Sequence, residues 1–409
     1  MNITITPHLL QGTLQVPPSK SQAHRLLIAA ALSQGESRLE NIALSQDILA
    51  TMDCMRALGA TLSADGTLVQ GIAAVQQTGT LPHFHCGESG STLRFLIPIA
   101  LAVCGGGVFT GEGRLMERPQ TPYFKLFREK GVAYSLQNGV LTVRGALKPG
   151  DYALPGNVSS QFFTGLLYAL PLLKGDSVLR ATTVLESRSY LDMTIQALQQ
   201  YGITIAVQPD GSFAIPGGQH GRATNGRAEG DWSQAAFYYA ANGIGNDVKL
   251  AGMNPDSVQG DRRIASFAAQ LAGACEVALD VSDCPDLVPP LAALAALRAG
   301  RTTRIINAAR LRMKESDRLQ TVTAALRAMG ASITELPDGL VITGQAQLPG
   351  GCKVDACNDH RIAMMTAIAA SRCQQPVTVI GAACVKKSYP NFWEDYERLG
   401  GKICREETE

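Results

Sequence analysis

Cationic and hydroxyl side chains gather where polar segments of the chain run into apolar ones. The segment PPSKSQAHRLLIAAAL contains Lys20, Ser21 and Arg25, with Ser21 and Arg25 one helical turn apart. The proline pair followed by Ser19 predicts that a helix begins here, and the free backbone N–H groups of a helix start receive carboxylate or phosphate. The segment therefore indicates anion binding, unless it is an ordinary capped helix whose Lys and Arg are solvated.

A glycine-rich turn and a proline-bounded loop offer further contacts to an anion. HCGESGSTLRFLIPIA sets Gly90 just before an apolar helix, where the missing side chain lets a ligand approach the backbone. In GEGRLMERPQTP, Arg118 precedes Pro119, which restricts Arg118 to extended backbone and presents its guanidinium from a stiff loop. A tight turn that caps a core helix and an incidental surface arginine are the alternatives.

Two more apolar helices are expected to begin with polar groups. GNVSSQFFTGLLYALPLL begins with Ser159, Ser160 and Gln161, which suit an oxyanion whose charge is balanced elsewhere. Simple capping explains one of these residues but hardly all three. ACNDHRIAMMTAIAA sets Arg361 in the polar head of an apolar helix, and CVKKSYPNF adds Lys387 near the C-terminus.

Carboxylates that could exchange protons occur beside cations. In ARLRMKESDRLQTVTAAL, Lys314 and Arg318 are four residues apart, which predicts one helix face, and Glu315 is adjacent. Cations lower the pKa of a carboxyl and burial raises it, so Glu315 can exchange protons if a dry site opposes the cations. Asp286 enters an apolar helix in DCPDLVPPLAALAAL as a candidate general base. A salt-bridged solvent face and a charge that complements the helix dipole are the alternatives.

Composition excludes several other classes of function. Lys plus Arg number 36 and Asp plus Glu number 35, so no global field favours nucleic acid or an acidic membrane. No GxxxxGK[ST] loop of a phosphate-binding kinase occurs. His83 and His85 lack a third ligand at fixed spacing, which favours surface histidines over a metal site.

The chain is expected to be a soluble cytoplasmic protein. Its ten cysteines contain no CxxC pair and are interpreted as reduced thiols. The start MNITITPHLLQG is not a signal peptide, and the longest apolar run, residues 95–104, is interrupted by Pro98 and is shorter than the roughly 20 residues of a membrane span.

A recurring phrase of amphipathic helix, glycine and two short β-rich runs predicts the architecture. The glycines that close the helices are spaced by 72, 71, 71, 57 and 70 residues, and they are Gly59, Gly131, Gly202, Gly273, Gly330 and Gly400. In the last copy the chain stops before a hairpin can form. Six similar α/β units, three in each of two domains, are expected, with one crossing near residues 226–237. The helix starts would then converge on one cleft that holds two anions. Common αββ patterning without true repetition is the alternative.

Seven segments together resemble one known family. SKSQAHR, GESGSTLR, ERPQTP, VSSQF, KESDRL, NDHR and VKKSYP occur in this order along essentially the whole chain and are similar to the 5-enolpyruvylshikimate-3-phosphate synthase family. The resemblance implies an α/β fold of two inside-out barrel domains, residues 20–229 and residues 1–19 plus 230–409, each of three βαβαββ-like units around a shared cleft. It also implies a monomer that needs neither metal nor organic cofactor.

The resemblance further implies a reaction and a set of site residues. The family transfers the enolpyruvyl group of phosphoenolpyruvate to the 5-hydroxyl of shikimate 3-phosphate and releases phosphate. Asp286 and Glu315 are the implied base and acid, with Lys20 the third catalytic residue. The implied contacts of shikimate 3-phosphate are Lys20, Ser21, Arg25, Ser159, Ser160, Gln161, Ser187, Tyr190, Asp286 and Lys314. Those of phosphoenolpyruvate are Lys20, Gly90, Arg118, Gln161, Arg318, Arg361 and Lys387.

Two residues depart from the family pattern, and two rival functions stay open. Arg310 stands where several relatives have Asn, and Glu88 stands where others often have Asn. The related transferase that acts on UDP-N-acetylglucosamine presents a Cys in the loop near Arg118, and GRLMERPQTP contains none. A non-catalytic anion-binding paralogue would have no need of intact Asp286, Lys314 and Glu315.

Overall fold

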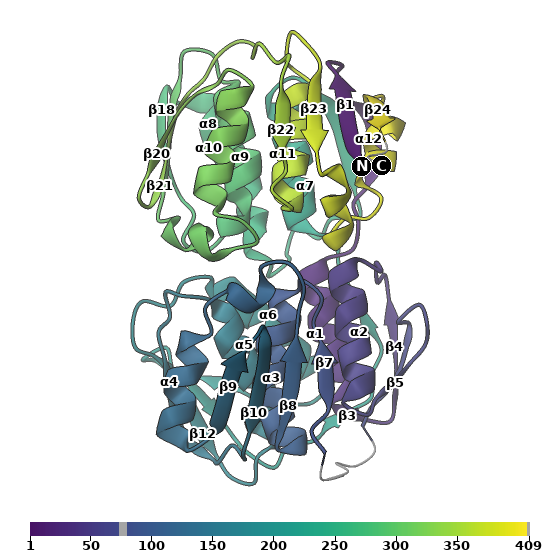
Figure 1. Cartoon of the computed structure of the whole chain (residues 1–409), viewed down its shortest axis with the longest axis vertical. Helices are drawn as coiled ribbons and strands as arrows, with labels where there is room; N and C mark the ends of the chain where they lie inside the picture. Colours follow the sequence, from purple (N-terminus) through teal and green to yellow (C-terminus); the bar gives the residue numbers. More distant parts are fainter. Residues whose placement is uncertain (73–79, 407–409) are drawn as a thin grey trace. The chain divides into compact units, whose positions relative to one another are not determined.

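The computed structural model describes residues 1–72 and 80–406. The chain divides into two compact units, which we call the central unit (Pro18–Glu229) and the terminal unit (Met1–Pro17 with Gly230–Glu409). Each unit has its own apolar core. In Figure 1 the central unit runs from purple to teal, while the terminal unit is mainly green and yellow. Among the described residues no helix has the length and apolar content of a membrane span.

The βαβαββ unit is complete within one continuous segment of the central unit. It consists of β7 (His83–His85), α3 (Gly90–Cys104), β8 (Gly106–Thr110), α4 (Thr121–Lys130), β9 (Ala133–Gln137) and β10 (Val140–Arg144). The sheet order is β7-β8-β10-β9, in which β7 lies parallel to β8 and the other neighbours are antiparallel. The predicted unit is therefore confirmed, with its two strand pairs in one sheet (Figure 1).

The same arrangement recurs once more in the central unit and once in the terminal unit. The central copy is β11 (Gly150–Leu154), α5 (Ser160–Ala169), β12 (Ser177–Ala181), α6 (Arg188–Gln200), β13 (Ala206–Val207) and β14 (Phe213–Ile215). The terminal copy is β18 (Glu276–Asp280), α9 (Val288–Ala296), β19 (Thr302–Ile306), α10 (Arg318–Ala328), β20 (Ser332–Leu336) and β21 (Gly339–Thr343). Their sheet orders, β11-β12-β14-β13 and β18-β19-β21-β20, follow the same rule.

Two further copies are completed by strands that are distant in sequence. The first copy takes β16 (Gly226–Arg227) as its parallel strand, which pairs with β4. Its other elements are α1 (Lys20–Ala31), β4 (Glu36–Glu40), α2 (Gln46–Ala57), β5 (Thr61–Leu62) and β6 (Leu68–Gln70). The last copy is β22 (Lys353–Asp355), α11 (His360–Ala370), β23 (Val377–Ile380), α12 (Phe392–Arg398) and β24 (Lys402–Glu406). Its final strand is β1 (Asn2–Thr6), which pairs antiparallel with β23 and β24.

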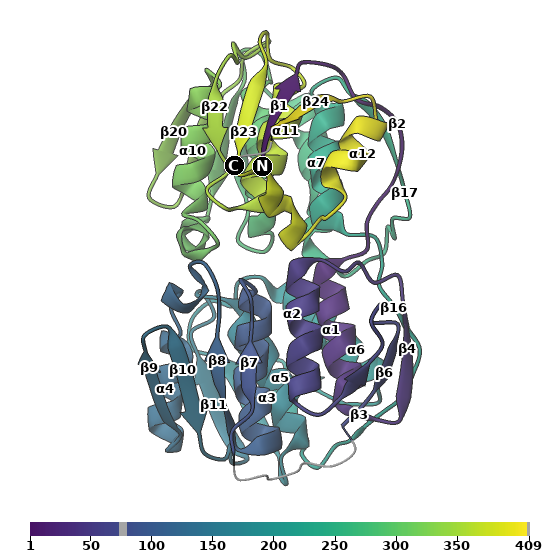
Figure 2. The same ribbon diagram turned by 45° about the vertical axis from the view of Figure 1, so that its right-hand side comes forward.

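The N-terminal strand takes the place of a second hairpin strand in the last copy. As predicted, no hairpin strand follows β24 among the described residues, and β1 occupies that place in the sheet. Both views show the chain ends side by side (Figures 1 and 2).

One copy has no hairpin, and this explains the short glycine spacing. It comprises α7 (Trp232–Gly243), β17 (Asp247–Ala251) and α8 (Ile264–Gly273), with β2 (Gln11–Gln15) parallel to β17. From α8 the chain, all of it described here, passes directly into β18. A small pair, β3 (Ser33–Gln34) with β15 (Gly221–Arg222), completes the central unit.

Most of the predicted closing glycines do adopt positive φ. These are Gly59, Gly131, Gly202, Gly330 and Gly400. Gly273 is the exception, since α8 ends there and Ala274 continues in extended backbone toward β18. The prediction of a left-handed residue was wrong at this one position, because a direct passage into a strand needs no reversal.

The most apolar helices lie inside each unit, whereas helices such as α8 bury only one face. Every residue of α9 and α11 is buried, as are nearly all residues of α3. A helix that is apolar on all sides must be buried, whereas strands such as β10 alternate between covered and exposed side chains. Helix α9 packs against α7 and α11 in the terminal unit, and α3 packs against α5 in the central unit (Figure 1). Only the ends of such helices can offer polar groups to a ligand.

Shortening a buried side chain of β1 should destabilise the terminal unit. Ile5 is wholly buried and pairs with Ile403 and Val377. We expect Ile5→Ala to lower the free energy of unfolding by about 2–5 kcal/mol, since a core cavity is created. Urea titration followed by tryptophan fluorescence measures this unit alone, because both tryptophans, Trp232 and Trp393, lie in its core.

The neighbouring exposed position provides the control. Thr6→Ala should change the free energy by less than about 0.5 kcal/mol, because Thr6 is exposed on the same strand. Equal effects of the two substitutions would show that β1 is not an integral part of the core.

Candidate functional site

A buried arginine organises the acidic residues of the terminal unit. The side chain of Arg318 is 1% exposed, and it donates to Asp286 at 2.8 Å, to Glu315 at 2.7 Å and to Asp359 at 2.8 Å. Arg318 is the first residue of α10, and the preceding Asp317 caps this helix by accepting from the backbone N–H of Gln320. One guanidinium thus gathers three carboxylates.

The cap at Asp317 also corrects the prediction for Lys314. Lys314 and Glu315 precede α10 and follow the 3-10 helix Ala309–Met313, so they do not share a helix face with Arg318. The prediction of a common helix face was wrong, because the capping carboxylate of Asp317 starts the helix only at Arg318.

Asp286 is surrounded by cations. It lies in the 3-10 helix Pro285–Leu287 that leads into α9, and its carboxylate accepts from Arg361 at 3.0 Å and lies 3.6 Å from the Nζ atom of Lys314. Burial raises the pKa of Asp286, but the charges of Arg361, Lys314 and Arg318 outweigh burial and hold this pKa well below its usual range. A carboxylate paired this strongly is a weak base, so it can accept a proton only when a bound anion competes for its cations.

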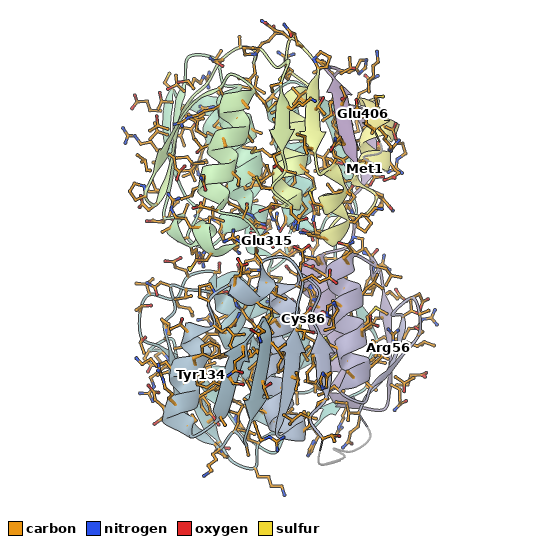
Figure 3. The ribbon with its side chains drawn as sticks, in the orientation of Figure 1. Met1, Arg56, Cys86, Tyr134, Glu315 and Glu406 are labelled. Carbon is orange, nitrogen blue, oxygen red and sulfur yellow. The ribbon has the colours of Figure 1, made fainter. Side chains whose placement is uncertain are left out.

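The pKa of Lys314 is also lowered, but for this residue the shift favours the neutral form. Burial lowers the pKa of its ammonium to about 8, although the charge of Asp286 partly offsets the effect and the charge of Arg318 adds to it. Glu315, labelled in Figure 3, is the next residue and accepts from Arg318. The ammonium of Lys314, whose pKa lies near neutral pH, and the carboxylates of Asp286 and Glu315, both paired with Arg318, form an acid-base set.

The start of α11 adds two more predicted cations. Arg361 is 5% exposed and binds Asp286, while Asp359 caps the helix and accepts from the backbone N–H of Arg361 at 3.0 Å. The Nζ atom of Lys387 donates to the carbonyl of Asn358 at 2.6 Å. The sequence interpretation placed Asp359 in this polar head but assigned it no role; its position before an apolar helix was the available signal.

A second buried carboxyl, Asp261, was not identified from sequence. It lies in the 3-10 helix Gly260–Arg263 before α8 and accepts a hydrogen bond from the hydroxyl of Ser233. Burial, followed by the negative charge of Asp286, raises its pKa to about 7, against the lowering effect of Arg361. Nothing in the local sequence QGDRR distinguishes this residue from a surface aspartate.

In the central unit the predicted helix start at Lys20 is confirmed. Ser19 caps α1, and Lys20 is its first residue. The ammonium of Lys20 donates to Asp47, near the start of α2, at 2.8 Å. Asp47 was missed because a carboxylate in a first turn is also what the helix dipole favours.

Arg25 lies one turn after Ser21 and is already bound within the protein. Its guanidinium donates to the carbonyl of Ser21 at 2.7 Å, to the carbonyl of Tyr190 at 2.9 Å and to the hydroxyl of Thr194 at 2.9 Å. Ser187, just before α6, is buried with φ of 55°. A serine reaches this left-handed region only when the surrounding structure imposes it.

The starts of α3 and α5 are joined by side chains. Ser159 caps α5 and Ser160 is its first residue. Gln161 accepts from Arg94 at 2.8 Å and donates to Ser91 at 2.9 Å. Arg94 was assigned no role from sequence, because an arginine inside an apolar helix indicates only a buried partner.

Arg118 and Gly90 are in close contact. Arg118 has extended backbone, with φ −66° and ψ 133°, as its position before Pro119 predicts. A Cβ atom at Gly90 would lie 2.6 Å from a terminal nitrogen of Arg118, so only glycine leaves this guanidinium in place.

The two departures from the family pattern are located near these groups. Arg310 is buried, donates to the carbonyl of Ser282 and contributes to lowering the pKa of Lys314. The carboxylate of Glu88 lies 2.7 Å from where a side chain at Gly113 would begin.

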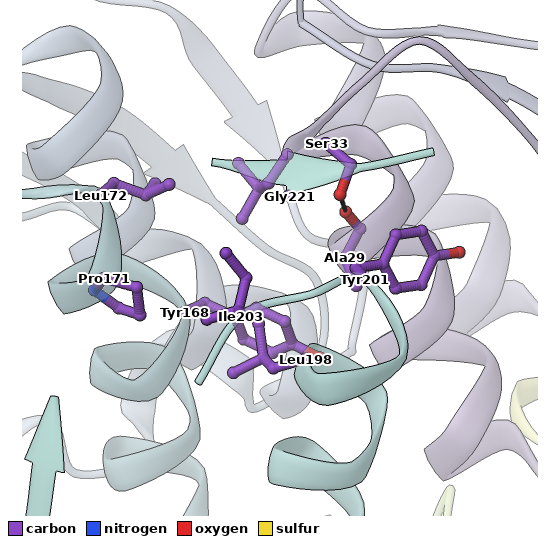
Figure 4. A pocket seen from close by; sticks show the side chains of 10 residues that line it. Ala29, Ser33, Tyr168, Pro171, Leu172, Leu198, Tyr201, Ile203 and Gly221 are labelled. Carbon is purple, nitrogen blue, oxygen red and sulfur yellow. Dashed lines mark hydrogen bonds between the residues drawn. The ribbon is translucent and has the colours of Figure 1, made fainter. Parts of the chain in front are cut away.

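Two cavities of the central unit have few of the predicted site residues in their walls. One holds about 10 Å³, room for a single water, and is lined mainly by apolar side chains such as Leu198 and Ile203 (Figure 4). A groove of about 470 Å³ includes Arg25 in its wall together with glutamine and methionine side chains.

The site residues divide chemically between the units. The central unit presents cations, hydroxyls and a glycine turn, whereas the terminal unit holds Asp286, Lys314 and Glu315 around Arg318. In the part of the chain that the structure describes, His, Cys, Asp and Glu side chains form no group of three or more suited to a metal ion.

The raised pKa of Asp261 predicts a pH dependence of stability. Between its ordinary value of 3.8 and about 7, the native state keeps a proton that the unfolded state has lost, so wild-type stability falls as the pH rises through this window. Asp261→Asn should remove that slope, which amounts to up to about 4 kcal/mol at about 1.4 kcal/mol per pKa unit. Urea titrations followed by tryptophan fluorescence at several pH values measure it.

An exposed carboxyl serves as the matched control. Asp256→Asn should leave the pH slope unchanged, because Asp256 is exposed. If stability depended on pH equally in wild type and in Asp261→Asn, the raised pKa of Asp261 would be contradicted.

The comparisons with known proteins agree over the full chain. A family model described as EPSP synthase (3-phosphoshikimate 1-carboxyvinyltransferase) matches residues 5–396. The 3-phosphoshikimate 1-carboxyvinyltransferases of Clostridium kluyveri and Clostridium acetobutylicum are 44% and 45% identical over 418 and 420 residues. Both alignments cover 98% of this chain and 98% of the relative.

Solved structures show the same fold. An EPSP synthase structure from Acinetobacter baumannii superposes with a TM-score of 0.79 at 25% sequence identity, over 99% of this chain and 100% of the other. A second structure from that organism gives the same values over 100% of both chains. Since the family model spans most of the sequence and its relatives match it from end to end, the chain belongs to the EPSP synthase family.

Proposed function

We propose that this chain transfers the enolpyruvyl group of phosphoenolpyruvate to the 5-hydroxyl of shikimate 3-phosphate and releases phosphate. Membership of the EPSP synthase family supports the reaction. The observation that carries the proposal is that Asp286, Lys314 and Glu315 are all present around the buried Arg318. A paralogue that only bound anions would not need this acid-base set.

We assign the ligands as the family resemblance implies. Residues 20–229 and residues 1–19 plus 230–409 are the proposed domains. Shikimate 3-phosphate is bound by Lys20, Ser21, Arg25, Ser159, Ser160, Gln161, Ser187, Tyr190, Asp286 and Lys314. Phosphoenolpyruvate is bound by Lys20, Gly90, Arg118, Gln161, Arg318, Arg361 and Lys387.

The proposed chemistry uses Asp286 as base and Glu315 as acid. Asp286 takes the proton of the 5-hydroxyl as its oxygen bonds to the central carbon of phosphoenolpyruvate, and Glu315 protonates the methylene carbon. Glu315, now a carboxylate, then takes a proton back from the methyl group of the tetrahedral intermediate as the carbon–oxygen bond to phosphate breaks. The C–H electron pair becomes the double bond of the enol ether, and phosphate leaves with the electron pair of the broken bond. A bound anion that draws Arg361 and Lys314 away from Asp286 raises the basicity of this carboxylate when it is needed.

We also propose that the enzyme acts as a cytoplasmic monomer on small molecules alone. It requires no metal, organic cofactor, nucleic acid or membrane. The near-equality of 36 basic and 35 acidic residues supports the absence of nucleic-acid and membrane partners.

The reaction itself is directly testable. Purified protein with shikimate 3-phosphate and phosphoenolpyruvate, in the presence of EDTA, should release inorganic phosphate. With UDP-N-acetylglucosamine as the acceptor, release should stay at background. Phosphate release only with the nucleotide sugar would establish the related transferase, and no release with either acceptor would leave a non-catalytic anion-binding protein.

Replacing the proposed acid should slow turnover without removing its contact. Glu315→Gln keeps an oxygen for the hydrogen bond from Arg318 at 2.7 Å but cannot supply a proton. We expect kcat to fall by about 10² to 10⁴ fold. Initial rates of phosphate release measure the change.

Glu335 provides a matched control. Its carboxylate accepts from Arg312 at 2.7 Å, much as Glu315 accepts from Arg318. Glu335→Gln should keep wild-type kcat. Wild-type turnover of Glu315→Gln, or an equal loss in both variants, would remove Glu315 from the chemistry.

A further inference from the structure

A buried chain of hydrogen bonds crosses three helices of the central unit. The Nδ1 atom of His24 in α1 lies 2.8 Å from the hydroxyl of Thr51 in α2, and this hydroxyl lies 2.6 Å from that of Thr92 in α3. Thr92 donates in turn to the hydroxyl of Ser89, the cap of α3, at 2.7 Å. All four side chains are at most 1% exposed.

The proton positions in this chain have one consistent order. The hydroxyl of Thr92 gives its proton to Ser89, so it accepts from Thr51. The carbonyl of Asp47 is the other possible acceptor for Thr51, but it is farther away, at 3.2 Å. Once Thr51 donates to Thr92, its remaining contact is to accept a proton from the Nδ1 atom of His24.

His24 is therefore expected to be neutral, with its proton on Nδ1. The Nε2 atom of His24 is buried without a hydrogen-bond partner among the described residues. Burial, with smaller contributions from the charges of Lys20 and Arg25, lowers the pKa of His24 well below its ordinary value. A second proton would have neither an acceptor nor a counter-charge at this place.

This series of hydrogen bonds lies next to the groups proposed to bind phosphoenolpyruvate, about one helical turn along α1 and α2. His24 follows Lys20 by four residues in α1, and Thr51 follows Asp47, the partner of Lys20, by four residues in α2. Ser89 directly precedes Gly90. The hydrogen bonds thus join the three helix starts that carry Lys20, Asp47 and Gly90.

We propose that His24 is a positioning residue, whose donated hydrogen bond aligns the starts of α1, α2 and α3 and so places Lys20 and the Gly90 turn for phosphoenolpyruvate. This inference rests on the proposed function for its ligand. Lys20 belongs to both proposed sets of ligand contacts, and Ser21 and Arg25, two further proposed contacts of shikimate 3-phosphate, also lie on α1. Loss of the alignment should therefore weaken the binding of both substrates.

Two substitutions of His24 separate positioning from packing. His24→Leu fills the space but removes the donor, and we expect the KM values for both substrates to rise about tenfold. His24→Asn places an amide N–H near the position of Nδ1 and should restore most of the affinity. Steady-state phosphate release measures both constants.

Ser33→Ala is the matched control at the other end of α1. Its hydroxyl donates to the carbonyl of Ala29 at 2.7 Å, also in a buried position (Figure 4). The variant should lose stability without a change in either KM. Unchanged KM values in His24→Leu, or a failure of His24→Asn to restore affinity, would overturn the positioning role.

A nuclear magnetic resonance measurement tests this series of hydrogen bonds without an activity assay. In protein labelled with ¹⁵N-histidine, the ring signals absent from His24→Asn identify His24. Near neutral pH they should show a neutral ring protonated at Nδ1, and Thr51→Val should shift them. Protonation at Nε2 would overturn the inference, whereas an Nδ1 proton in a protein that releases no phosphate would leave the network intact and refute only the proposed reaction.

Discussion

The guanidinium of Arg318, almost wholly removed from solvent, requires several carboxylates to offset the loss of its hydration. Asp286, Glu315 and Asp359 meet this requirement from three different parts of the terminal unit. Breaking a buried ion pair of this kind costs about 3–5 kcal/mol, because the remaining charge has no compensation. Folding of the terminal unit and assembly of its acid-base set are therefore the same event, and any ligand anion that enters must compete for cations already in use.

The burial of whole helices inside each unit explains why the polar residues stand at helix starts. Helices such as α9 and α11 are buried along their whole length, so their sides accept only apolar neighbours. Their ends still require partners for free backbone N–H groups, and these come from Ser19, Ser89, Ser159 and Asp359. The same ends attract anions, which places structural capping and the proposed ligand binding on neighbouring residues.

The central unit secures its helix starts through lateral contacts rather than one central charge. The Lys20–Asp47 pair joins α1 to α2, and Gln161 joins α5 to Arg94 and Ser91 of α3. Behind them, the chain from His24 to Ser89 links α1, α2 and α3 through hydroxyl groups. The geometry of a site built from several such links is sensitive to small displacements of helices, which explains why His24, itself no proposed ligand contact, contributes to that geometry.

The order of repeats, the cap at Ser19 and the extended backbone of Arg118 could be predicted from sequence, because periodicity, capping residues and proline act on neighbouring residues. Tertiary structure alone decided that β1 completes the last sheet and that Asp47, Arg94 and Asp261 join the polar groups. Lys314 and Glu315 lie outside α10 because of the local cap at Asp317, which the sequence prediction did not recognise. In the other cases a long-range strand pairing or a burial energy chose among arrangements that short sequence patterns leave equal, and such terms arise only when distant segments meet.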